Sequence, residues 1–437
     1  MVLRKLLFCF LLLATSLAQP VSILPLAHAD GILVLAAGSG SSGVYDAETD
    51  IGLVANDATQ GTAEDNTEKL SDALQAQWRG GSFTFVNGTT GPVLKPIVCQ
   101  AKQFFFYGPI KTSNRVGGAL FGTGRPGYHL PEDQYTTGGS TYGGLNTRFT
   151  RIDGENGGGV IRLRGTGFVL VGIDIKGQRY LTNVSTSGTR SDACIEIEGR
   201  DDPASGNHII SNCALGFAEC GVLAIAGYYN DDDEFVEMPV SGGQQGRGVH
   251  ADETLVDSCT FAAVDKCIRS ENEQAVNWSF RDLTVGGSTA FEPIVFDADK
   301  GGKWTHTGTL GLNHPKVTVL RIGSYSGYYN RYDIGTISWD HFSGSGHYCR
   351  LTDVALAAGD WSSYEGLHIR MYGSLSRYSG DWDSDPGDQK LFRFTSGITN
   401  LNCSKMLYDF NNGMPTANMT QSSGPWYYPT TAWIPSP

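Results

Sequence analysis

Four stretches of the chain decide the fold: Leu170-Val-Gly-Ile-Asp-Ile175, Ile210-Ser-Asn-Cys-Ala-Leu215, Val256-Asp-Ser-Cys-Thr-Phe261 and Trp278-Ser-Phe-Arg-Asp-Leu283. When they are aligned end to end, apolar residues recur at the same positions, so the chain contains an imperfect internal repeat. The shortest step of this repeat, from Phe261 to Leu283, is 22 residues. Short apolar strands repeated at such a step are typical of stacked β coils, each of which buries its apolar positions against its neighbours.

A second set of strand-like runs is interleaved with the first. It comprises Cys194-Ile-Glu-Ile-Glu198, Cys220-Gly-Val-Leu-Ala-Ile225 and Cys267-Ile-Arg-Ser-Glu271. This alignment places Cys194, Cys220 and Cys267 in successive coils, and likewise Cys213 with Cys259, as disulfides between coils or as an unbridged column of thiols. Glycine, at 57 of 437 residues, is about twice as common as usual. We therefore predict an all-β solenoid with many tight turns.

One segment predicts a helix. Thr62-Ala-Glu-Asp65 resembles a capping box, and the apolar residues Leu70, Ala73, Leu74 and Trp78 recur at helical spacing. We expect this helix over residues 62–78.

The first thirty residues have the three parts of an export signal. Arg4 and Lys5 form a basic start, Leu6–Leu13 is an apolar run, and Ala27-His-Ala29 is a small-x-small cleavage site. We predict a signal peptide over 1–29, and hence a secreted, periplasmic or cell-surface protein. An extended segment over 30–61, a β domain over 62–410 and a Pro/aromatic-rich tail over 411–437 would follow.

Residues 55–176 resemble the opening of proteins of the pectate-lyase-like superfamily. The resemblance rests on Asp65-Asn-Thr67 before the predicted helix, on Gly118-Ala-Leu-Phe-Gly-Thr-Gly124 and on Gly159-Val-Ile-Arg-Leu-Arg-Gly165. It implies a right-handed parallel β-helix whose open end is capped by the N-terminal helix, where apolar core and strand edges would otherwise be exposed. The likeness extends well to about residue 300 and loosely to 410, and it is specific for fold rather than activity.

The stretch from Asp192 to Ile225 is similar in layout to polygalacturonase-type glycoside hydrolases. That family places paired aspartates before the first run and Gly-His-Gly before the last. Here Ala193 and Cys220 occupy the positions of the second aspartate and the histidine. The resemblance therefore supplies the layout without the full catalytic motif.

The chain is acidic, with a formal net charge of −13. An acidic surface repels nucleic-acid phosphates, and no stretch beyond the predicted leader reaches the roughly eighteen apolar residues that a membrane span needs. We therefore expect neither a nucleic-acid partner nor membrane insertion, and the oligomeric state stays open. A polyanionic polysaccharide would also be repelled, unless basic residues cluster locally or a cation bridges the two.

Strand alternation places a group of charged side chains on one outward face. In the runs at 193–198, 266–271 and 294–299, apolar residues point inward and the charged residues between them point outward. The candidate catalytic residues are Glu196, Arg269, Glu271 and Asp297. The candidate substrate-binding residues are Glu198, Asp299 and Lys266. The insert at 228–249 would border a groove along this face.

Carboxylates gathered near an arginine can bind sugar hydroxyls, hold Ca²⁺, or act as general acid and base on a glycosidic bond. We expect a polysaccharide partner, with cleavage either by hydrolysis or by a lyase reaction in which Arg269 or Lys266 is the base. No cofactor would be required. The alternative is a solvated face whose charges pair between strands, in a non-enzymatic surface, adhesion or structural protein.

A further acidic stretch, Asp381-Trp-Asp-Ser-Asp-Pro-Gly-Asp388, spaces carboxylates like the start of a calcium loop. Gly387 falls one position late and Phe392 stands where an EF-hand has glutamate. The alternatives are an irregular Ca²⁺ loop and a solvated acidic turn. The candidate metal ligands are Asp381, Asp383, Asp385 and Asp388.

The second half of the chain is rich in aromatic residues, among them Tyr332, Trp339 and Tyr372. Exposed rings could stack on sugar faces along a glycan, whereas buried rings would form core stacks between coils. The sequence leaves both assignments open.

Overall fold

The computed structural model of the protein describes residues 43–78, 81–123, 146–153, 158–177, 193–199, 205–230, 233–237, 250–286, 292–323, 331–339, 348–356, 358–360, 367–375, 392–394, 398–399 and 403–410. All of these belong to one unit, residues 37–437. The described residues are mostly β-strand and include one α-helix. Within them, no helix is long and apolar enough to cross a membrane.

The helix, α2, spans Gln60–Gln75 and so begins and ends slightly earlier than 62–78. Leu70 and Leu74 on its apolar face are buried. Asn66 fixes the helix to its neighbours, because its amide accepts from the Val54 N–H at 2.8 Å and donates to the Phe105 carbonyl at 3.1 Å. Trp78 lies outside the helix with a left-handed backbone and an exposed ring, so it is not part of the apolar face as expected.

In the described part of the chain, twenty-five strands form one sheet in which the strand pairs are parallel, and their pairings follow three ladders. The first ladder contains β1 (Tyr45–Asp46), β4 (Ile97–Cys99), β7 (Val116–Gly122), β10 (Thr166–Val171), β14 (Ile209–Ser211), β19 (Leu255–Asp257), β21 (Ser279–Gly286), β23 (Trp304–Leu312), β25 (Arg331–Trp339), β28 (Leu367–Leu375) and β31 (Cys403–Phe410). The second ladder contains β6 (Ile110–Lys111), β9 (Gly159–Leu163), β12 (Ala193–Ile197), β15 (Ala214–Ala224), β20 (Thr260–Ser270), β22 (Ile294–Ala298), β24 (Lys316–Ile322), β26 (Tyr348–Val354) and β29 (Phe392–Phe394). The third ladder contains β5 (Gln103–Phe106), β8 (Thr147–Arg151) and β11 (Ile173–Lys176), and continues through the first residues of β15 and β20.

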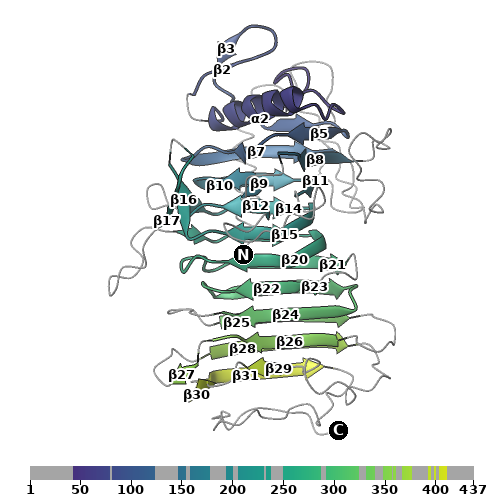
Figure 1. Ribbon diagram of the computed structural model, residues 1–437, viewed down its shortest axis with the longest axis vertical. Helices are drawn as coiled ribbons and strands as arrows, with labels where there is room; N and C mark the ends of the chain where they lie inside the picture. The colour runs from purple at the N-terminus through teal and green to yellow at the C-terminus, as the bar shows by residue number, and fades with distance from the viewer. Residues whose placement is uncertain are drawn as a thin grey trace, which may run out of the picture. The chain divides into compact units, whose positions relative to one another are not determined.

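The remaining strands are short. Two antiparallel hairpins are formed by β2 (Phe83–Thr84) with β3 (Thr90–Gly91) and by β16 (Gly227–Tyr229) with β17 (Phe235–Glu237). The other short strands are β13 (Ser205–Gly206), β18 (Ala251–Asp252), β27 (Gly359–Asp360) and β30 (Ile398–Thr399). Figure 1 shows the ladder strands stacked in sequence order, with α2 beside β5.

The register confirms most of the predicted repeat. Leu170 pairs with Ile210 and Ile210 with Val256, as the first three stretches align. Val256 pairs with Phe280 rather than with Trp278, so the fourth stretch is displaced by two residues and its step is 24 residues, not 22. Trp278 is fully buried, and its indole N–H donates to the Ala251 carbonyl at 2.6 Å before the strand begins.

The strand register confirms one of the two predicted alignments of cysteines and contradicts the other. Cys213 and Cys259 are neighbours, because Ala214 pairs with Thr260 and the Thr260 N–H donates to the Cys213 carbonyl at 2.9 Å. Cys220, however, lies one position out of line with Cys194 and Cys267, because Ala193 pairs with Cys220 and Cys220 with Lys266. The cysteines that the structure describes are free, buried thiols: Cys99, Cys194, Cys213, Cys220, Cys259, Cys267 and Cys349.

Gly221 stands in the column between Cys194 and Cys267, and we expect Gly221→Ala to lower the free energy of unfolding by about 1–3 kcal/mol. A Cβ there would lie 2.5 Å from Phe261 Cδ1 and 2.6 Å from the Cys267 carbonyl oxygen. Gly91→Ala is the matched control, because no atom lies within 4 Å of its added Cβ. Urea unfolding of the two variants measures the difference, and equal midpoints would contradict the assigned packing.

Large aromatic residues fill the core of the first ladder. The rings of Trp278 and Trp304 stack with centroids 5.9 Å apart and planes at 20°. Tyr332 and Trp339 are fully buried, so they belong to the core rather than to a glycan surface. Tyr372 is exposed.

Candidate functional site

One row of outward-facing residues runs along the second ladder, and we call it the charged row. Its members point away from the core because inward positions are held by residues such as Ile195, Ile268 and Phe296. The register pairs its members in this order: Lys111, Arg162, Glu196, Leu223, Arg269, Asp297, Arg321 and Asp353. Leu223 divides the row into two halves that differ in their access to solvent.

The half before Leu223 is buried. Glu196 and Glu198 have side chains only 1% and 0% exposed, although sequence alternation led us to expect them in solvent. Arg162 Nε lies 3.2 Å from Glu196 Oε1, and Arg164 Nε lies 3.4 Å from Glu198 Oε1. The Gly159 N–H also donates to Glu196 Oε2 at 3.1 Å. These two glutamates are therefore partners of two buried guanidinium groups.

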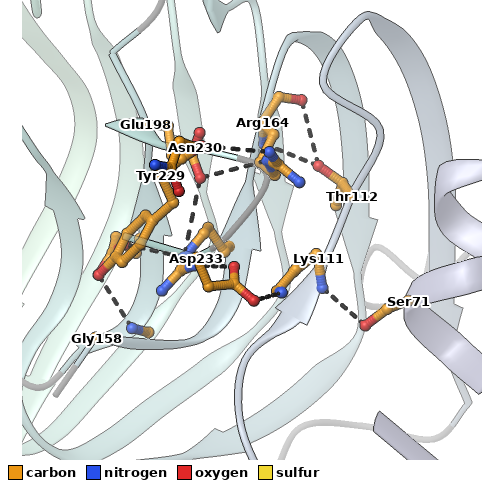
Figure 2. A network of polar contacts seen from close by, with 12 residues as sticks. Ser71, Lys111, Thr112, Gly158, Arg164, Glu198, Tyr229, Asn230 and Asp233 are labelled. Carbon is orange, nitrogen blue, oxygen red and sulfur yellow. Dashed lines mark hydrogen bonds and ion pairs between the residues drawn. The ribbon is translucent and has the colours of Figure 1, made fainter. Parts of the chain in front are cut away.

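The hairpin β16–β17, the first part of the 228–249 insert, contacts this buried half (Figure 2). The Tyr229 ring lies over Arg162, with 3.2 Å between the guanidinium carbon and the ring centroid. Asp233 forms ion pairs with Lys111 and, at 3.6 Å, with Arg162 Nη1. Arg164 Nη2 donates to the Tyr229 carbonyl at 3.5 Å. The insert therefore helps to seal this half of the row rather than bordering an open groove over Glu196.

A small apolar cluster separates the two halves. Its members are Ala193, Cys220, Leu223, Ile225 and Tyr229, all buried outside the main core. Because apolar contact excludes water, the ion pairs of Glu196 and Glu198, in the half of the row before Leu223, lie in a region of low dielectric constant.

The half after Leu223 is only partly buried, and the side chains next to Arg269 reach solvent. Glu271 and Asp299 have side chains 33% and 23% exposed, and Arg269 contacts both of them, at 3.0 Å and 4.0 Å. Beneath them Asp297 is fully buried, with its carboxylate 3.8 Å from Arg269 Nη1 and 2.8 Å from Arg321 Nη1. The structure thus brings together four of the predicted site residues on β20 and β22 and the turns that follow them.

The electrostatics around Glu271 in this open cluster favour a carboxyl group that keeps its proton to unusually high pH. Burial raises the pKa of Glu271, and the neighbouring carboxylate of Asp299 raises it further, while Arg269 opposes both. Burial acts to lower the pKa of Arg269, but the carboxylates of Glu271 and Asp297 outweigh it and hold that pKa above its usual value. Arg269 is therefore a permanent cation, and Glu271 retains its proton to higher pH than an ordinary glutamate.

Lys266 does not join the open cluster. It lies in the neighbouring row, between Cys220 and Ile294, and its ammonium group is 2.6 Å from Glu219 Oε1. This pairing was not anticipated, because Glu219 is in a different run of the sequence. Lys266 remains a candidate for substrate contact, although it is already paired.

The candidate calcium ligands Asp381, Asp383, Asp385 and Asp388 lie outside the described residues. Among the residues that the structure does describe, no group of three or more His, Cys, Asp or Glu side chains is arranged to hold a metal ion.

Sequence reasoning missed the cations that complete the site. Arg162 and Arg164 alternate with Ile161 and Leu163, so their outward direction was readable. Their partners were not, because Glu196 lies more than thirty residues further along the chain. Arg321 was likewise not linked to Asp297.

No protein-family model, no curated protein and no solved structure matches this chain.

Proposed function

We propose that this protein is an exported right-handed parallel β-helix, related in architecture to the pectate-lyase-like superfamily, which binds an extracellular polysaccharide and hydrolyses it at Glu271 and Asp299. The parallel ladders described above support the fold. The observation that carries the function is the partly exposed pair of Glu271 and Asp299, joined through Arg269.

The proposed chemistry uses two carboxyl groups in different roles. Glu271, whose pKa is raised by burial, donates a proton to the glycosidic oxygen. Asp299, which contacts Arg269, bonds to or stabilises the sugar carbon that loses this oxygen, and a water molecule that gives its proton to Glu271 then adds to that carbon and releases the sugar. The two residues directly follow the paired strands β20 and β22, which lie about 4.8 Å apart, so both carboxyl groups can contact one glycosidic bond.

A second candidate function is a non-enzymatic surface or adhesion protein built on the same fold. It is favoured by the pairing of opposite charges along the row, since Arg269, Asp297 and Arg321 already neutralise one another. Such pairing is what a solvated wall of a solenoid would need.

A polysaccharide panel separates these functions. The protein is incubated with neutral, carboxylated and sulfated polysaccharides, and new reducing ends, unsaturated products and bound glycan are all measured. Reducing ends without unsaturation support hydrolysis. Unsaturated products would replace it with a lyase reaction, binding without products would leave adhesion, and neither binding nor products would overturn the proposal.

The pH dependence of kcat/KM tests whether Glu271 is the acid. Because the proposed reaction needs protonated Glu271, kcat/KM should fall as pH rises through the pKa of Glu271. Arg269 lowers that pKa, so Arg269→Gln should move the alkaline limb to higher pH, in addition to lowering the rate. Arg281→Gln, which removes an exposed arginine paired with Asp257, should leave the limb in place. A limb that moves to lower pH in Arg269→Gln would contradict the assignment of Glu271 as acid.

A further inference from the structure

A second charged surface lies on the first ladder. It has more basic than acidic residues. On β25 the residues Arg331 and Asp333 point away from the core, and on β28 the residues His368 and Arg370 do so. Arg331 is in register with His368, and Asp333 with Arg370. We call these four residues the basic patch.

Basic groups outnumber acidic groups in this patch. Asp333 contacts all three basic side chains, with Arg331 Nε at 2.7 Å, His368 Nε2 at 3.7 Å and Arg370 Nη1 at 3.7 Å. The residue in register with His368 on the next strand, β31, is Lys405, so the column Arg331, His368, Lys405 carries basic residues on three successive strands. Like charges at directly opposed positions destabilise a sheet. The half of the charged row after Leu223 avoids this by alternating Arg269, Asp297, Arg321 and Asp353, whereas the column of Arg331, His368 and Lys405 consists of basic residue types alone.

The arginines of the patch are accessible to a ligand. Arg331 and Arg370 have side chains 59% and 38% exposed. Arg370 Nη1 lies 3.7 Å from Asp333 Oδ1, which is longer than a charge-assisted hydrogen bond. An exposed guanidinium whose ion pair is this long can still form two parallel hydrogen bonds to a carboxylate or a sulfate.

An exposed aromatic ring lies beside the patch. Tyr372 follows Arg370 on the same face of β28, and its ring reaches over Gly335 of β25. A Cβ at Gly335 would stand 3.0 Å from Tyr372 Cε2, so the absence of a side chain there leaves room for the ring. A ring with one open face next to two cations suits a ligand that has both apolar ring faces and negative charges.

We propose that the basic patch and Tyr372 form a binding site for an anionic polysaccharide, with sulfate or carboxylate groups at Arg331 and Arg370 and a sugar ring on Tyr372. The site rests on the proposed function for the glycan nature of its ligand, but it is separate from Glu271 and needs no cleavage. It resolves the conflict between an acidic chain and an anionic glycan, because a local basic cluster offsets the net charge of −13. Nucleic acid is a poorer fit, because phosphates at every nucleotide would meet the acidic surface beyond the patch.

The test measures equilibrium binding of the whole protein to dextran sulfate, polygalacturonate, neutral dextran and single-stranded DNA. The double variant Arg331→Ser/Arg370→Ser is compared with Arg115→Ser/Arg281→Ser, which removes the same charge at exposed positions outside the patch. We expect binding to an anionic dextran or galacturonan and not to neutral dextran. The patch variant should lose about 100-fold in affinity, as expected for two charge-assisted contacts, and the control variant about threefold or less.

The arms of the experiment separate the outcomes. Preference for dextran sulfate or for polygalacturonate identifies the anionic group, and Tyr372→Ala should weaken either by about tenfold without changing the fold. Equal losses in the two double variants would mean that net charge alone acts, and tighter binding of DNA than of glycan would assign another ligand; either result overturns the proposal. If the unmodified protein binds the anionic polysaccharide and yields no products, the proposed hydrolysis is refuted and this site is left intact.

Discussion

Glu271→Gln is expected to abolish polysaccharide cleavage, by about 100- to 10,000-fold in kcat, while leaving the thermal unfolding of the protein nearly unchanged. Glutamine has the shape of glutamic acid but cannot release a proton to the glycosidic oxygen. The side chain of Glu271 is one-third exposed and contacts Arg269, so its neutralisation leaves no buried charge without a partner. The measurement is turnover of the polysaccharide that the panel identifies, with unfolding followed in parallel.

The control for this variant is Glu273→Gln, two residues further along the same turn and outside the charged row. It should keep full activity. If Glu271→Gln cleaves as fast as the parent protein, Glu271 is not the acid, and the open cluster is a solvated wall of paired charges.

Arg162→Met is expected to lower the free energy of unfolding by about 3–5 kcal/mol, because it leaves buried carboxylates without their cation. Arg162 is itself buried, and it contacts Glu196, Asp233 and the ring of Tyr229. Methionine restores most of the volume but none of the charge. The variant should therefore also loosen the hairpin β16–β17, which would appear as faster amide hydrogen exchange at Tyr229.

The matched control is Lys316→Met, in which the lost ion pair with Glu292 joins two exposed side chains. Exposed pairs contribute about 0–1 kcal/mol, so its unfolding midpoint should change little. Similar losses in the two variants would show that the pairs of Arg162 are no more protected from water than a surface pair, contrary to the burial described here.

The parts of the fold that the sequence predicted rest on alternation, which is a local property. Ile195 and Ile197 fix the direction of Glu196 whatever the strand pairs with, so the outward faces could be read directly. The displacement of Trp278 could not be read in this way. A slip of two residues keeps the same face inward, so Phe280 and Trp278 give the same pattern. The offset of Cys220 escaped notice for a related reason, since Gly221 has no side chain that marks a face.

The division of the charged row into a buried and an open half could not be predicted at all. It depends on where the hairpin β16–β17 packs, and that is decided by Tyr229 and Asp233 meeting Arg162 from a strand far away in the sequence. Outward direction was therefore mistaken for exposure at Glu196 and Glu198. The same alternation placed Glu271 and Asp299 outward, and there no described segment covers them.

Carboxyl labelling with a water-soluble carbodiimide, read by mass spectrometry with and without bound polysaccharide, tests this division most directly. We expect Glu271 and Asp299 to react in the native protein and to be protected by the glycan, while Glu196, Glu198 and Asp297 react only after unfolding. Labelling of Glu196 and Glu198 in the native protein, or labelling of Glu271 that the glycan leaves unchanged, would contradict the assignment of the open cluster as the site and of the buried half as its support.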